Sequence, residues 1–226
     1  MKLKIPIIII SYNRLSYLKD LVEYFLNLNE EHIYILDNNS TYPPLLDWFE
    51  KINKNINVVR YDKNFGHTVY WKTEFYKNIQ DCTYCVITDH DIIPYKSFEK
   101  EWKENWIEYL NKYKVRKVGS ALNLSDIPES FDLKQRVLNQ ETKFWSTELE
   151  KNVFSAGLDT TLFLQKVNNN HRTTNAIRLS NYLIKHRPWY EDLNNQTEEN
   201  IYYYKSISTP TFYSKVIKKI NDRTNI

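Results

Sequence analysis

Two aspartates separated by one residue, in Asp89-His90-Asp91, are the residues of this sequence best suited to chemistry. They follow the apolar run Tyr84 to Thr88, so both carboxylates are expected at the tip of a buried strand. Hard divalent cations prefer such oxygens, and a cation held there would bridge a diphosphate and neutralise charge on the leaving group. A simpler alternative is that Asp89 caps a turn before Pro94 and Asp91 is merely solvated.

Composition excludes the common glycine-rich ways of holding a phosphate. The chain has three glycines, Gly66, Gly119 and Gly157, so it contains neither a GxGxxG dinucleotide fingerprint nor a GxxxxGK[ST] phosphate loop. Cys82 and Cys85 form a lone CxxC in a strand-like run, with no second pair and no histidine at zinc-finger spacing. We therefore predict buried thiols there and not a zinc or redox site.

Repeated strand-then-helix units must position the two aspartates. Strands are predicted over residues 5–11, 33–36, 56–61 and 84–88. Helices are predicted after an N-cap at Asn13, from Pro43-Pro44, and between His67 and Ile79. This order indicates an α/β fold with a mostly parallel sheet and helices on both faces.

The loops at the carboxyl ends of these strands are the expected ligand site, because ligands of parallel sheets bind beyond those ends. All four loops are polar: Tyr12-Asn13-Arg14, Asp37-Asn38-Asn39, Asn64-Phe65-Gly66-His67 and Asp89-His90-Asp91.

The second half is less regular. It predicts a helix over 98–113 capped by Ser97, strands over 115–124, 153–165 and 178–184, and an aromatic helix over 198–219. With no internal repeat and no linker, we predict one domain over 1–226, nucleotide-binding to about residue 95 and acceptor-binding from about 96.

Charge and hydropathy limit the partners and the compartment. The net charge of +3 comes without a dense basic tract, which argues against nucleic-acid binding. No apolar run approaches the roughly 20 residues of a membrane span, and residues 1–10 lack a signal-peptide cleavage site. We expect a soluble, cytoplasmic protein without a transmembrane segment.

Four stretches together resemble the opening of glycosyltransferase family 2-like enzymes with the GT-A fold: Ile7 to Arg14, Tyr34 to Thr41, Asn64 to His67, and Val86 to Asp91. Two later stretches, 156–164 and 186–192, resemble a subset of that family. The resemblance implies a single GT-A domain that moves a sugar from a nucleoside-diphosphate donor, a UDP-sugar first among them, to a glycan hydroxyl with inversion, as in polysaccharide biosynthesis.

The resemblance also implies site residues. The expected nucleotide-sugar contacts are Tyr12, Arg14, Asp37, Asn39, Asn64, Gly66, His67 and Asp89. Mn²⁺ or Mg²⁺ would be held by Asp89, Asp91 and a later histidine, for which His186 is best placed by order. The competing histidines are His32, His67, His90 and His171, and the side chain of His90 is expected to point away from its neighbours if that stretch stays extended.

The catalytic base needs a carboxylate beside the acceptor hydroxyl. Asp159 is the first candidate, because an acid inside an apolar strand is unfavourable unless it faces a cleft. Asp192 and Glu191 follow, since the family's usual base lies in a similar acidic pair. The alternatives are a retaining transferase, a nucleotidyltransferase, which normally has a glycine-rich loop, and a non-catalytic carbohydrate- or metal-binding module.

Overall fold

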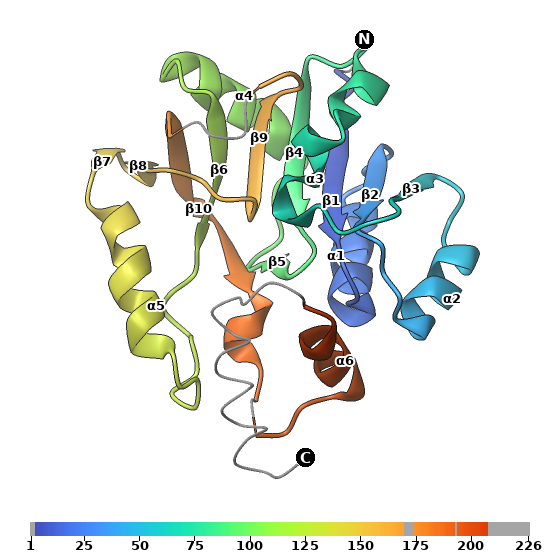
Figure 1. Cartoon of the computed structure of the whole chain (residues 1–226). Coiled ribbons are helices and arrows are strands. Elements are labelled where there is room, and N and C mark those ends of the chain that lie inside the picture. Colours follow the sequence, from blue (N-terminus) through green and yellow to red (C-terminus); the bar gives the residue numbers. More distant parts are fainter. Residues whose placement is uncertain (1–2, 170–173, 193, 208–226) are drawn as a thin grey trace.

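The computed structural model describes residues 3–169, 174–192 and 194–207, and these form one ten-stranded sheet with helices around it (Figure 1). The strands are β1 (Ile7–Ser11), β2 (Ile33–Asp37), β3 (Ile56–Arg60), β4 (Tyr84–Asp89), β5 (Ile92–Pro94), β6 (Lys117–Leu122), β7 (Glu148–Glu150), β8 (Val153–Ser155), β9 (Leu162–Lys166) and β10 (Ala176–His186). The α-helices are α1 (Leu15–Asn27), α2 (Pro43–Lys51), α3 (Val69–Lys72), α4 (Trp102–Lys112), α5 (Lys134–Glu141) and α6 (Glu198–Ser206). Short 3-10 helices span Gly66–Thr68, Phe75–Ile79, Thr142–Trp145 and Arg187–Tyr190.

The first half of the chain builds the parallel part of the sheet, in the order β3-β2-β1-β4. The register pairs Ile10 with Asp89 and Ser11 with Asp37, so the carboxyl ends of three neighbouring strands meet at one edge. The predicted α/β class is confirmed, as are the four strands predicted in this half and their parallel arrangement.

The second half adds strands of both directions. β9 lies antiparallel between β4 and β6, and β6 and β10 run parallel to each other. The single strand predicted over 153–165 is wrong, because β8 and β9 occupy different places in the sheet. Asp159 therefore lies in the loop between them and not inside a strand.

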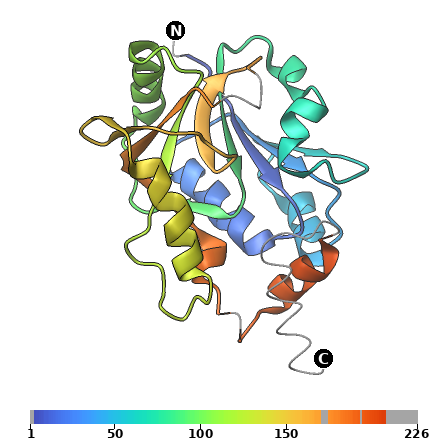
Figure 2. The ribbon, with the colours of Figure 1, turned by 60° about the vertical axis from the view of Figure 1, so that its left-hand side comes forward.

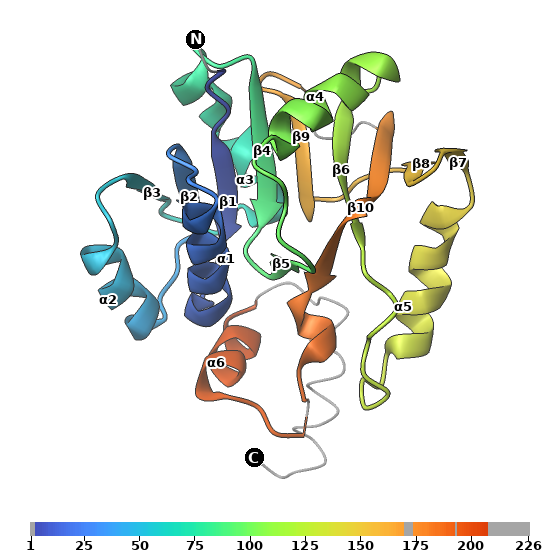
Figure 3. The same ribbon diagram turned by 180° about the vertical axis from the view of Figure 1, so that it is seen from behind.

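The alternating isoleucines of β1 explain why the sheet is covered on both faces. Ile7 and Ile9 belong to one core with α1 and α4, which includes the stacked rings of Phe25 and Trp102. Ile8 and Ile10 belong to a second core on the other face, against α3 and the 3-10 helix after it. Figure 3 shows α1 and α4 in front of the sheet, whereas Figure 1 shows α3 on the opposite side.

The start of α1 is held differently from the prediction. Asn13 does not cap α1: its backbone is left-handed (φ 47), and its side-chain oxygen accepts hydrogen bonds from the backbone N–H groups of Thr41 (2.6 Å) and Tyr42 (2.9 Å), ahead of α2. The first N–H groups of α1 instead donate to the carboxylate of Glu199 in α6. The N-terminus of α1 is therefore capped by a carboxylate that is distant in sequence and not by a neighbouring residue.

Three further helix predictions need correction. The helix predicted up to Ile79 is broken into short pieces by Glu74, which is left-handed (φ 54). The helix predicted from Ser97 begins at Trp102. The helix predicted over 198–219 ends as α6 at Ser206, because the backbone of Ile207 is extended, and 208–226 lie outside the described residues.

Two negative expectations concern the thiols and the membrane. Cys82 and Cys85 are buried and free, as predicted. Within the residues that the structure describes, no helix combines the length and apolar character that crossing a bilayer requires.

Gly119 in β6 is a packing constraint that can be tested. A Cβ added there would lie 2.4 Å from the backbone oxygen of Leu162 and 2.7 Å from Cβ of Phe163, so β6 and β9 would have to separate. We expect Gly119→Ala to lower the free energy of unfolding by about 1–3 kcal/mol in urea titrations. Gly157→Ala, where nothing lies within 4 Å, is the matched control and should change it by less than about 0.5 kcal/mol; equal effects would contradict the packing argument.

Candidate active site

A cleft of about 510 Å³ opens at the carboxyl ends of the parallel strands. It is bounded by the loops after β1, β2, β3 and β4 and by α6, which lies at the end of the molecule opposite the N-terminus (Figures 1 and 2). The lining residues are Ile10, Ser11, Tyr12, Asn38, Asn64, Phe65, Gly66, His67, Thr68, Lys72, Asp89, His90, Asp91, Tyr203 and Ile207.

The loop after β3 is fixed to the loop after β2 by one amide side chain. Asn38 accepts from the N–H of Phe65 (3.1 Å) and donates to the carbonyl of Gly66 (3.3 Å). Gly66 has a positive φ of 71, where only glycine is unstrained, and its N–H donates to Asn64 (2.7 Å). This wall of the cleft is therefore formed before any ligand binds.

Asp89 and Asp91 face the cleft and interact with each other. Burial, and next the negative charge of Asp91, raise the pKa of Asp89 well above its ordinary value. Burial also pushes the pKa of Asp91 upwards, but the charge and hydrogen bond of His186 outweigh it, so this pKa lies below the usual range. Two close, half-buried carboxylates that resist joint ionisation are a site that a cation would stabilise.

His186 is brought to this pair by β10. Its Nε2 lies 3.5 Å from Oδ2 of Asp91, and the N–H of Arg187 donates to the carbonyl of Asp91 (2.8 Å). Among the described residues, no three acidic, histidine or cysteine side chains are gathered closely enough to form a complete metal site. The structure therefore provides a pair of candidate ligands, Asp91 and His186, with Asp89 beside them.

An extended stretch would turn His90 away from Asp89 and Asp91, but in the structure all three residues line the cleft. β4 ends at Asp89 and the chain turns at His90, whose Nδ1 lies 2.9 Å from the carbonyl oxygen of Ile10. Burial lowers the pKa of His90, so the ring is neutral and Nδ1 carries the proton toward that carbonyl. Its Nε2 and the hydroxyl of Ser11 have no hydrogen-bond partner among the described residues, and both residues line the cleft.

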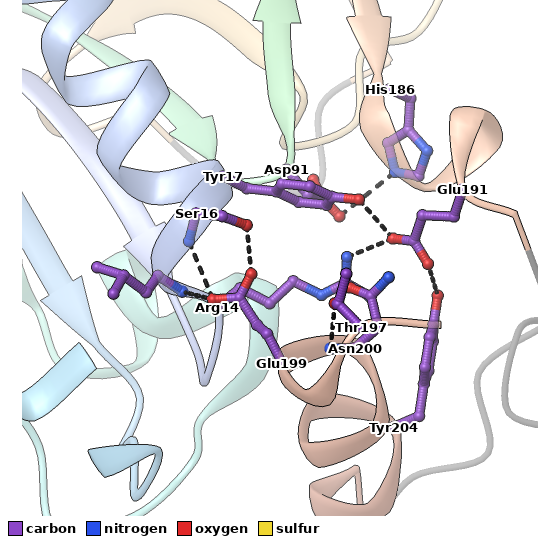
Figure 4. Close-up of polar contacts among 11 residues, drawn as sticks. Arg14, Ser16, Tyr17, Asp91, His186, Glu191, Thr197, Glu199, Asn200 and Tyr204 are labelled. Carbon is purple, nitrogen blue, oxygen red and sulfur yellow. Dashed lines mark hydrogen bonds and ion pairs between the residues drawn. The ribbon is translucent and has the colours of Figure 1, made fainter. Parts of the chain in front are cut away.

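Behind the cleft lies a buried ion pair (Figure 4). The Arg14 guanidinium is 1% exposed and donates to Glu191, which is 4% exposed, at 2.5 Å. Glu191 also accepts from the hydroxyls of Tyr17 and Tyr204, each at 2.7 Å. The guanidinium carbon lies 4.0 Å from the ring centre of Tyr203, a cation–π distance.

The same geometry corrects two of the predicted site residues. Arg14 was expected at the nucleotide and Glu191 was a candidate base, but neither lines the cleft and each neutralises the other. A carboxylate that already accepts from a guanidinium and two phenols is poorly placed to take a proton from a substrate.

Asp37 and Asn39 are also displaced from their predicted roles. Both oxygens of the buried Asp37 are engaged inside the protein, by the N–H and hydroxyl of Ser40 and by Nε of Arg60 at 3.1 Å. Arg60 reaches it because the two residues are register partners on β2 and β3. Asn39 is exposed and left-handed (φ 61) and does not line the cleft.

The two remaining candidate bases are exposed. Asp159 precedes Thr160, whose hydroxyl donates to Asp89 Oδ2 (2.6 Å) and whose carbonyl accepts from the N–H of Asp89 (2.8 Å). Asp159 is therefore held beside the cleft, and its charge contributes to the raised pKa of Asp89. Asp192 follows Glu191 and accepts from the N–H of Asn194 (2.9 Å).

The structure thus places six predicted residues in the cleft: Tyr12, Asn64, Gly66, His67, Asp89 and Asp91. Lys72 and Tyr203 line it too and were not predicted. Lys72 lies in the helical piece that follows the predicted 64–67 loop, so a basic residue close to that loop was the available signal. For Tyr203 no local pattern indicated that α6 returns to the strand ends.

Replacing Glu191 tests whether this residue is structural. Glu191→Gln leaves the Arg14 charge buried without a counter-charge, and we expect a loss of about 3 kcal/mol in the free energy of unfolding, measured by urea titration. Asp192→Asn, which changes the exposed neighbouring carboxylate, should shift it by less than about 0.5 kcal/mol. A Glu191→Gln protein as stable as the parent would contradict the assigned role.

No family model and no curated protein matches the sequence. Among solved structures, the mannosyltransferase PcManGT from Pyrobaculum calidifontis, in complex with GDP-Man and Mn²⁺, is 14% identical with a TM-score of 0.51, over 89% of this chain and 59% of that chain. GalNAc-T7, solved with UDP, GalNAc and Mn²⁺, is 12% identical with a TM-score of 0.54, over 98% of this chain and 54% of that chain. The chain spans little more than half the length of these structures. It has the mixed α/β fold of the GT-A glycosyltransferases.

Proposed function

We propose that this chain is a metal-dependent glycosyltransferase that moves a sugar from a nucleoside diphosphate to a hydroxyl of a glycan acceptor. The observation that carries the proposal is the placement of Asp89 and Asp91 at the tip of β4, inside a cleft lined by four strand-end loops. The two similar structures were solved with GDP-Man and Mn²⁺ and with UDP, GalNAc and Mn²⁺, which supports this class of ligand.

Asp89, Asp91 and His186 would hold Mn²⁺ or Mg²⁺, and the ion would supply positive charge beside the diphosphate leaving group. The two carboxylates fit either cation, and an imidazole nitrogen makes the softer Mn²⁺ the better match of the two. The interaction of Asp91 with both Asp89 and His186 favours the same assignment. Phosphate oxygens and water complete the coordination of these ions in proteins, so three gathered protein ligands are not required.

The nucleotide would lie along the wall formed by Tyr12, Asn64 and His67, with Gly66 allowing close approach. Lys72 adds a cation to this wall, although its ammonium also donates to the carbonyl of Phe65 (3.0 Å). A UDP-sugar is our first choice of donor.

Asp159 is our proposed base. In an inverting transfer the acceptor oxygen bonds to C1 of the sugar as the bond from C1 to the diphosphate breaks, and the carboxylate takes the hydroxyl proton. Asp159 is exposed, and the hydrogen bonds of Thr160 hold its loop against Asp89, so it can reach an acceptor at the cleft. Asp192 is the second choice, because it is exposed whereas Glu191 is enclosed.

The metal-dependent donor site is tested by thermal shift with UDP, GDP, CDP and dTDP, each with and without Mn²⁺. At 100 times Kd a ligand adds about 2.7 kcal/mol, which corresponds to a rise in Tm of roughly 5–10 °C for a chain of this size. We expect such a rise for one nucleotide with Mn²⁺, and its loss in Asp91→Ala. Asp132→Ala, at an exposed loop carboxylate, should keep the rise. A chain that no nucleotide stabilises would be better explained as a binding module.

Turnover tests the base separately from donor binding. Asp159→Asn should leave the donor-induced thermal shift unchanged and lower the transfer rate by about 100-fold or more, measured as release of nucleoside diphosphate in the presence of acceptor. A normal rate would show that Asp159 is not the base, and Asp192→Asn would then test the second candidate. The anomeric configuration of the product, read by NMR, distinguishes inversion from retention.

A further inference from the structure

A second hollow lies at the opposite end of the sheet from the cleft. Its volume is also about 510 Å³, and it is bounded by the end of α4, the loop into β6 and the loop after β9. Because β6 runs parallel to β4 and Lys117 is level with Cys85 across β9, this first residue of β6 lies near the amino ends of the strands, about 13 Å along the strand direction from the level of Asp89. The lining residues are Leu110, Asn111, Lys114, Val115, Arg116, Lys166, Asn168 and Asn169.

Three cations converge on this hollow. The side chains of Lys114, Arg116 and Lys166 are exposed, and none of them forms an ion pair with a described residue. No carboxylate is among the lining residues. Within the described part of the chain, seven other lysines form an ion pair with a carboxylate, as Lys112 does with Glu150 (2.6 Å). Three unmatched positive charges around one concave surface repel one another and raise the local concentration of anions.

The backbone that carries these cations is firmly held. The N–H of Arg116 donates to the carbonyl of Asn175 (2.9 Å), and the side chain of Asn169 donates to the carbonyl of Arg116 (2.9 Å). The N–H of Val115 donates to the carbonyl of Leu110 at the end of α4 (3.2 Å). Lys114 occupies the left-handed position after this helix (φ 51), where glycine is the usual residue. The backbone positions from which the charged side chains project are thus fixed.

An adjoining hollow of about 560 Å³ shares Lys166 and Asn168 with the first and adds Lys77. It too has no carboxylate among its lining residues, although Lys77 is paired with Glu74. The two hollows together form one continuous basic surface, which has room for a phosphate group and for part of the molecule that carries it.

We propose that Lys114, Arg116 and Lys166 form a binding site for a phosphate group, carried by a soluble molecule or by a lipid headgroup. Lysine and arginine make charge-assisted hydrogen bonds to phosphate oxygens, and the amide of Asn168 or Asn111 adds a neutral donor. The site is separate from the cleft and does not depend on the proposed transferase activity. Phosphate binding at this end leaves the cleft open.

The test uses the full chain in EDTA, so that no divalent ion draws phosphate to the cleft. Inorganic pyrophosphate, followed by calorimetric titration, probes the soluble form, and co-sedimentation with phosphatidylglycerol vesicles probes the lipid form. The variant K114Q/R116Q/K166Q should weaken whichever binding occurs by about tenfold or more. The matched variant K51Q/K54Q/K100Q removes the same charge at exposed lysines elsewhere and should weaken it by less than about twofold.

Binding of pyrophosphate that is lost only in K114Q/R116Q/K166Q supports a soluble phosphate ligand, and the same pattern with vesicles supports a headgroup. Equal weakening in both variants, or no binding of either probe to the parent chain, overturns the proposal. Nucleotide binding with Mn²⁺ should be unchanged in K114Q/R116Q/K166Q, so a failure of this site and a failure of the transferase proposal give different results.

Discussion

The buried ion pair between Arg14 and Glu191 is the interaction on which the arrangement of the cleft depends. It joins the loop after β1 to the segment between β10 and α6, which are 177 residues apart along the chain. Buried charges are tolerated when they are paired and hydrogen-bonded, and here two tyrosine hydroxyls also donate to the carboxylate. On the guanidinium, Nη1 donates to Glu191, whereas Nε and Nη2 have no hydrogen-bond partner among the described residues and lie among aromatic rings. Burial above all, and next the negative charge of Glu191, raise the pKa of Tyr17, which keeps this phenol a donor.

Around that pair, polar side chains from distant parts of the chain accept the backbone hydrogen bonds that neighbouring residues usually accept. Glu199 receives the first N–H groups of α1, and Asn13 receives those ahead of α2. Asn38 holds the loop after β3. The walls of the cleft are thus fixed by side-chain to backbone bonds between different loops, and a ligand would not have to order them on binding.

The sequence predicted the parts of this structure that depend on neighbouring residues. Apolar runs located the strands, and parallel strands align their ends, so Tyr12, Asn64 and Asp89 were correctly expected together. Arg14 and Asp37 lie at the same ends, but each found a partner inside the protein, in Glu191 and in Arg60. A polar residue after a strand looks the same in sequence whether it meets a ligand or an opposite charge, and only the fold distinguishes the two. The single-domain assignment over 1–226 stays a prediction.

The contribution of α6 to the cleft has a consequence for folding. Tyr12 donates its hydroxyl proton to the carbonyl of Ser206, a contact that spans 194 positions, and Tyr203 forms part of the cleft surface. Closing so long a loop carries a large entropic cost that is recovered only after the strands between are in place. The aspartates at the tip of β4 precede α6 along the chain, but the cavity around them is completed only when α6 docks. The capacity to bind a ligand there is therefore among the last properties that this chain acquires as it folds.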